Sequence, residues 1–157
     1  MLLASIVSQQ ILFIRNGKSI KNYPISTSKL SPSCLEGSLG TPWGLHQICQ
    51  KIGGGAEIGT VFEGRVSIGI TAEQCSDEKK MRNLITSRIL RLDGLENGIN
   101  KGGNVDTFNR YVYIHGTNHE DKIGTPSSSG CLQMINSDIV ELFEEIKVGT
   151  HLYISVN

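Results

Sequence analysis

Alternating apolar and polar positions dominate the first half of the chain and predict short strands. Apolar residues over Ile11–Arg15 lead into Asn16-Gly17, and a returning strand is expected over Ser19–Ile25. The Asn-Gly pair favours a two-residue hairpin turn because both residues tolerate a positive φ. Further strands are predicted over Leu45–Ile52, Val61–Ile70 (in pieces), Ile85–Leu92, Arg110–His115 and Thr150–Val156. Ser26–Gly44 and Asp93–Asn109 have loop composition.

One amphipathic helix is predicted near the C-terminus. Apolar residues follow the i, i+3, i+4, i+7 spacing of a helix face, at Ile139, Leu142, Phe143 and Ile146. The run Asn136-Ser137-Asp138 offers N-cap side chains, and Gly149 is expected to end the helix. The charged stretch Gln74–Arg82 predicts either a second, short helix or an exposed loop.

Composition indicates one mostly-β domain over residues 1–157, with a few helices. The chain has 157 residues, enough to bury a sizeable core, and its 18 glycines favour a turn-rich β fold over a helical bundle. Its formal net charge is +0, which argues against nucleic acid or an anionic membrane as a partner. No apolar stretch approaches the ~20 residues that span a bilayer.

The candidate chemistry lies in one histidine and one cysteine on either side of a glycine-rich loop. His115 ends the apolar run Tyr111–Ile114, and Cys131 follows Ser127–Gly130 16 positions later. A free thiol has a pKa near ~8.5, so it becomes a good nucleophile at neutral pH only if a base removes its proton. Histidine, with a pKa near ~6.5, can take that proton and return it to a leaving amine. The pair therefore predicts nucleophilic catalysis.

The residues around this pair resemble the active-site signature of the L,D-transpeptidases, the YkuD-domain family. The resemblance rests on Ile114-His115-Gly116-Thr117, Ile123–Pro126 and Ser128–Met134, and it extends from about Gln10 to the end of the chain. Two positions depart from the family pattern. Ser129 stands where the family usually has a second histidine, and Gln133 stands where it usually has arginine.

The resemblance implies a β-sandwich or barrel that cross-links peptidoglycan stem peptides. Cys131 would attack a tetrapeptide donor, expel D-alanine and form a thioester, with His115 as the base. The Gly116 carbonyl would orient His115. The N–H groups of Gly130 and Cys131 would hold the oxyanion. Ser129, Gln133 and His46 are the predicted substrate contacts, and carbapenem-type inhibitors are expected to acylate the thiol.

Neither a metal nor another cofactor is expected. His46 and Cys49 could form half of a metal site, but no second pair of ligands stands at zinc spacing, and a packed core histidine is the alternative for His46. If Cys131 is a nucleophile, the three other cysteines cannot all pair within the chain. Counting therefore favours free thiols at Cys34, Cys49 and Cys75.

Two other functions remain open at this stage. Water could accept the acyl group, which would make an L,D-carboxypeptidase, or the departures at Ser129 and Gln133 could mark a domain that binds stem peptides without chemistry. The resemblance implies the cell envelope or periplasm. Met1–Val7 lacks the basic n-region of a signal peptide, so a cytoplasmic location is the alternative.

Overall fold

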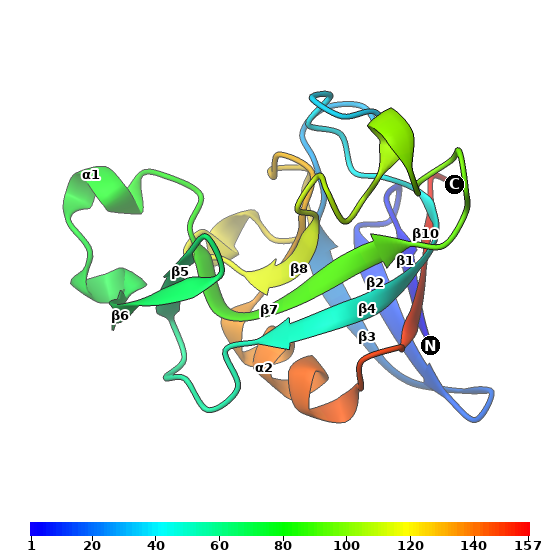
Figure 1. The fold of residues 1–157 in the computed structure, drawn as a ribbon. Helices are drawn as coiled ribbons and strands as arrows, with labels where there is room; N and C mark the ends of the chain where they lie inside the picture. Colours follow the sequence, from blue (N-terminus) through cyan, green and yellow to red (C-terminus); the bar gives the residue numbers. More distant parts are fainter.

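The computed structural model describes residues 1–157, and its strands form one continuous sheet (Figure 1). The strands are β1 (Leu2–Ser5), β2 (Gln10–Arg15), β3 (Lys18–Ser26), β4 (Gly44–Ile52), β5 (Thr60–Glu63), β6 (Val66–Thr71), β7 (Ile85–Gly94), β8 (Tyr113–Gly116), β9 (Leu132–Met134) and β10 (His151–Ser155). Their spatial order is β4-β10-β1-β2-β3-β9-β8-β7-β5-β6. A further pairing of β4 with β7 closes the sheet into a barrel, which confirms the mostly-β prediction.

The β5–β6 hairpin extends the sheet outside this closed ring. β5 pairs with the first residues of β7, where Val61 lies opposite Thr86 and Phe62 opposite Ile85. The short helix α1 (Asp77–Lys80) follows β6, as one of the two predictions for this stretch. In Figure 1 the hairpin and α1 stand away from the barrel, on the side where β7 begins.

The predicted C-terminal helix is α2 (Asn136–Glu145), which buries Ile139, Leu142 and Phe143. Its predicted ends were wrong. At the C-terminus, Ile146 already has an extended backbone (φ −112°, ψ 161°), because its side chain turns into the core. At the N-terminus, Ile135 occupies the cap position without a side-chain hydrogen bond. Neither helix has the length and hydrophobicity needed to cross a membrane.

Alternation along β8 and β9 separates the barrel interior from an outer face. Ile114 of β8 pairs with Leu132 of β9, and both side chains are fully buried in the main core. The intervening residues therefore project from the opposite face. On that face a smaller cluster joins Tyr113 to Phe62 of β5 and Ile89 of β7, with Cys131 packed against it. The candidate site lies on this outer face.

The sequence pattern missed two strands and misplaced the start of a third. β1 and β9 were not predicted, although β1 pairs with both β2 and β10 and β9 joins β3 to β8. The strand expected over Arg110–His115 begins only at Tyr113. Tyr111 lies in a turn with a φ of +55°, a left-handed conformation outside the extended region of a regular strand.

Candidate active site

Two adjacent parallel strands bring His115 and Cys131 together. The β8–β9 register places His115 opposite Gln133, and Cys131 immediately precedes β9. The Tyr113 N–H donates to the Cys131 Sγ at 3.3 Å, so the thiol lies beside the residue two positions before His115. Because side chains two residues apart share a face of a sheet, the imidazole and the thiol project from the same side as diagonal neighbours.

The Gly116 carbonyl fixes the tautomer of His115. The distance from His115 Nδ1 to the Gly116 oxygen is 2.6 Å, and a carbonyl oxygen can only accept a hydrogen bond, so Nδ1 carries the proton. The Nε2 atom of a neutral ring then keeps its lone pair. Burial lowers the pKa of His115 to about 4, which keeps the ring neutral at pH 7. His115 therefore has the form that a general base requires.

Close packing requires glycine at position 116. A Cβ atom there would lie 2.5 Å from Asn136 Oδ1 and 2.6 Å from the Thr86 carbonyl oxygen. Asn136 Oδ1 accepts hydrogen bonds from Thr86 Oγ1 (2.6 Å) and Ser87 Oγ (2.5 Å), so these neighbours are held in place. Asn136 of α2 and the start of β7 thus hold the Gly116 backbone in place. The carbonyl of Gly116 in turn orients His115.

The thiol of Cys131 is protonated in the resting protein. Burial raises its pKa to about 11, and the Tyr113 N–H and the charge of Arg110 lower it only in part. At pH 7 about one molecule in 10⁴ would hold a free thiolate. With both groups neutral, the free lone pair of His115 Nε2 is available as an acceptor for the thiol proton.

Cys131 borders a groove of about 360 Å³, which is the candidate substrate site. One wall is Tyr111 and Arg110, and Ser129 and Gly130 continue the wall next to Cys131. The opposite wall is the loop between Ser33 and Gly40. Arg110 holds this loop against the first wall, because its guanidinium donates to the carbonyls of Ser33 (3.0 Å) and Gly40 (2.7 Å). No motif near Arg110 indicated its role, because its partners lie about 70 residues earlier in the chain.

Only one of the two predicted oxyanion donors is free. The Gly130 N–H donates to Ser128 Oγ at 3.2 Å, whereas the Cys131 N–H has no acceptor within the protein. Ser128 Oγ also donates to the Cys131 carbonyl at 2.6 Å, which fixes the turn. The role predicted for the Gly130 N–H stays a prediction, and in this structure that N–H is engaged within the turn. Gly130 also supplies a φ of +123°, which side-chain-bearing residues rarely adopt.

Two of the predicted substrate contacts lie away from the groove. His46 is fully buried on β4, where its ring meets the Gly44 carbonyl at 3.0 Å and Thr107 Oγ1 at 3.1 Å, so it is a packed core histidine. Gln133 is also buried, and its Oε1 accepts from Ser127 Oγ at 3.3 Å. Gln133 neighbours His115 across the strand pair and does not line the groove. Ser129 alone of the three is exposed there.

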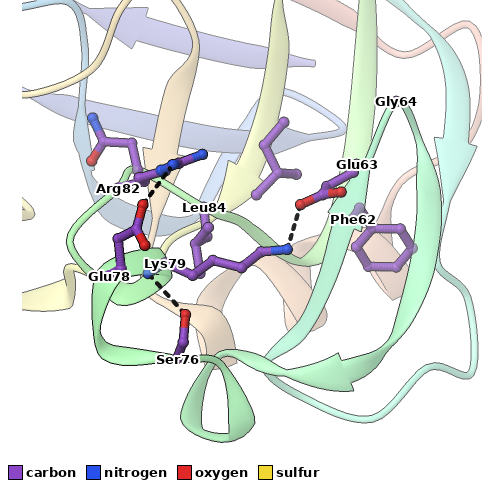
Figure 2. A pocket seen from close by; sticks show the side chains of 10 residues that line it. Phe62, Glu63, Gly64, Ser76, Glu78, Lys79, Arg82 and Leu84 are labelled. Atoms are coloured by element: carbon purple, nitrogen blue, oxygen red, sulfur yellow. Dashed lines mark hydrogen bonds and ion pairs between the residues drawn. The ribbon is translucent and has the colours of Figure 1, made fainter.

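A second hollow, of about 500 Å³, lies between the β5–β6 hairpin and α1 (Figure 2). Its charged side chains are paired with each other: Lys79 with Glu63, and Arg82 with Glu78 at 3.3 Å. Ser76 caps α1 by accepting the Lys79 N–H. None of its lining side chains is a nucleophile with a neighbouring base, so it is not the candidate catalytic centre.

The two buried neutral histidines predict a loss of stability in acid. Burial lowers the pKa of both His46 and His115 to about 4, whereas an unfolded histidine titrates near ~6.5. Between these values unfolding takes up protons, so the free energy of unfolding falls as the pH falls, by up to about 3 kcal/mol for each histidine. Urea unfolding at pH 7 and pH 4.5 measures this loss.

The matched controls for acid stability are His46→Gln and His151→Gln. The first removes a buried histidine and is expected to reduce the difference in stability between the two pH values. The second changes an exposed histidine on β10 and should leave that difference unchanged. An equal loss of stability in the wild type and in His46→Gln would contradict the assignment of a buried neutral ring.

A thiol on the same face as a tautomer-fixed histidine, opening onto a groove at the outer face of a β barrel, has the groups that acyl transfer through a cysteine requires. The family comparison identifies the domain. Residues 1–154 match the YkuD family, the L,D-transpeptidase catalytic domain, and the chain belongs to that family.

Individual relatives share the fold and parts of the sequence. An L,D-transpeptidase from Mycobacterium smegmatis matches 99% of this chain and 58% of its own, with 18% identity and a TM-score of 0.56. L,D-transpeptidase 3 from Mycobacterium tuberculosis, in complex with a faropenem-derived adduct, matches 98% and 59%, with 12% identity and a TM-score of 0.60. The Bacillus subtilis (strain 168) protein named Putative L,D-transpeptidase YqjB is 45% identical over 49 residues, 31% of this chain and 28% of that protein. The chain thus spans less than two thirds of these relatives.

Proposed function

We propose that residues 1–157 form one catalytic domain that cross-links peptidoglycan stem peptides through a thioester on Cys131. The observation that carries the proposal is the 2.6 Å contact of His115 Nδ1 with the Gly116 carbonyl. It leaves Nε2 as a proton acceptor on the same face as the thiol. Membership of the L,D-transpeptidase family supports the choice of stem peptides as substrates.

The first half-reaction makes the acyl-enzyme. The Cys131 sulfur attacks the carbonyl carbon at the L-centre of diaminopimelate in a tetrapeptide stem while its proton moves to His115 Nε2. The Cys131 N–H, free of any protein acceptor, donates to the oxyanion. When the tetrahedral intermediate collapses, the C–N bond breaks, His115 returns the proton to the amine, and D-alanine leaves.

The second half-reaction transfers the acyl group. The side-chain amine of a second stem attacks the thioester carbonyl and passes a proton to His115. The C–S bond then breaks, and the sulfur takes back a proton as the thiol. One amide bond is broken and one is formed, so the exchange needs no external energy source or redox partner. Both substrates belong to the cell wall, and we therefore place the activity in the cell envelope.

Carbapenem-type compounds are proposed inhibitors by the same chemistry. One structural relative, LdtMt1, is described in complex with imipenem; it matches 98% of this chain and 57% of its own, with a TM-score of 0.58. A strained β-lactam carbonyl placed in the Cys131 groove would acylate the thiol as the peptide does.

Incubation with a disaccharide-tetrapeptide, followed by measurement of free D-alanine and mass analysis of the products, tests the proposal. Release of D-alanine with a cross-linked dimer is the expected result. Release with tripeptide as the only peptide product, even with excess acceptor, would replace transfer by hydrolysis. Binding of the tetrapeptide without release of D-alanine would contradict catalysis and favour a stem-peptide-binding domain.

A further inference from the structure

Arginines without carboxylate partners gather near the thiol. Two of the six arginines form ion pairs, Arg15 with Glu145 and Arg82 with Glu78. The other four have no carboxylate within 4.0 Å, at Arg65, Arg88, Arg91 and Arg110. Three of these four line the Cys131 groove or contact a residue that lines it. Arg110 lines it, and Arg65 and Arg91 lie over the ring of Tyr111, at 4.9 and 5.0 Å from its centroid.

Most donors of Arg91 and Arg110 are already used within the protein. Arg91 donates to Gln50 Oε1 and to the Phe108 carbonyl, and it is buried. Arg110 donates to two loop carbonyls and to Ser38 Oγ. Arg65 makes a single hydrogen bond, from Nη1 to Tyr113 Oη at 3.1 Å. Its Nη2 and Nε groups are therefore available to an external acceptor.

The backbone conformation of Arg65 is unfavourable for its residue type. Glu63 pairs with Val66, so Gly64 and Arg65 form the two-residue loop of the β5–β6 hairpin, with φ values of +54° and +68°. Such loops favour glycine or asparagine at these positions, and a larger side chain there costs about 1 kcal/mol. Tyr111, the residue beneath the guanidinium, is also left-handed (φ +55°) and is 52% exposed. Strain in two residues that contact each other beside a nucleophile is typical of a ligand site.

The resemblance to the family implies an arginine two residues after the cysteine, and this chain has the buried, neutral Gln133 there. We propose that Arg65, at the tip of the β5–β6 hairpin and stacked on Tyr111, binds a carboxylate of the donor peptide at the mouth of the Cys131 groove. This inference rests on the proposed function and names a specificity-determining residue for it. A guanidinium can meet a carboxylate with two parallel hydrogen bonds, which fixes both position and orientation.

Glu36 is the only carboxylate that lines the groove, and it belongs to the opposite loop. The charge around the mouth is therefore positive on balance, which favours an anionic peptide over a cationic one.

Binding in the Cys131→Ala background tests the inference without turnover. Calorimetric titration uses the disaccharide-tetrapeptide and analogues in which each carboxylate is converted in turn to an amide. Arg65→Gln, which replaces the guanidinium by a neutral and shorter amide, is expected to weaken binding of the unmodified peptide about tenfold or more. It should leave unchanged the binding of the one analogue that lacks the recognised carboxylate. Arg65→Lys should restore part of the affinity.

Arg82→Gln is the matched control, because Arg82 is exposed and paired with Glu78. An equal weakening for every analogue would show that Arg65 only holds the hairpin to Tyr113, and would overturn the inference. No effect of Arg65→Gln, or no binding of the tetrapeptide, would also overturn it. Arg65-dependent binding with no release of D-alanine by the wild type would contradict the transfer reaction alone.

Discussion

Replacement of Cys131 by alanine is expected to abolish every covalent peptide adduct and to slow D-alanine release by about 10⁴-fold or more. No other side chain that lines the groove is a thiol, and the two hydroxyls there, of Ser129 and Tyr111, make no hydrogen bond to a side-chain base. The loss should occur at unchanged stability, because the alanine keeps the Cβ of a residue that is already partly exposed. Stopped assays with a disaccharide-tetrapeptide measure the rate, and urea unfolding measures the stability.

Cys49→Ala is the matched control for this variant. Cys49 is also partly buried, its thiol donates to the Arg91 carbonyl at 3.4 Å, and burial raises its pKa. It lies on β4, outside the groove. We expect its removal to leave the rate within about twofold of wild type. A Cys131→Ala protein that still releases D-alanine at a comparable rate would remove Cys131 from the mechanism.

Replacement of His115 by glutamine is expected to lower the rate of acyl-enzyme formation by about 10² to 10⁴-fold. A glutamine amide fills part of the same space but cannot carry the thiol proton. Because burial raises the pKa of the Cys131 thiol to about 11, the variant should recover activity as the pH rises and hydroxide takes over deprotonation. In the wild type the rate should fall as the pH approaches 4, where His115 becomes protonated.

His119→Gln is the control for that experiment. His119 lies in the loop after β8, and its Nε2 is 3.1 Å from the Arg82 carbonyl, so it shares the neighbourhood without facing the thiol. Its replacement should leave both the rate and the pH profile unchanged. Similar losses in the two variants would indicate a general disturbance of the loop rather than loss of a base.

The sequence predicted those elements whose defining residues lie close together along the chain. The apolar stripe of α2 is complete within eight residues, and the Asn16-Gly17 turn positions β2 against β3. By contrast, β1 and β9 have only four and three residues. Each depends in part on a partner far along the chain, β10 for β1 and β3 for β9, and a short window of sequence does not contain those partners. The early end of α2 has the same origin, since core packing draws Ile146 out of the helix.

The site was predictable in its chemistry but not in its surroundings. The residues around His115 and Cys131 resemble a known signature, and the Gly116 carbonyl contact followed from that resemblance. The sequence could not decide whether His46 lies in the core, and it did not predict the burial of Gln133, because a polar residue in a strand gives no indication of which hydrogen-bond partners will enclose it. The contact of Arg65 with Tyr111 joins a hairpin tip to a turn 46 positions later, so only the folded chain could reveal it.

The most direct test of the account is the mass of the protein and of its proteolytic peptides after brief mixing with the disaccharide-tetrapeptide and an acid quench. The account predicts one adduct per chain, equal to the donor minus D-alanine, on the peptide that contains Cys131. The adduct should disappear on treatment with hydroxylamine, as a thioester does. Release of D-alanine without any adduct on Cys131, or an adduct on Cys34, Cys49 or Cys75 instead, would contradict it.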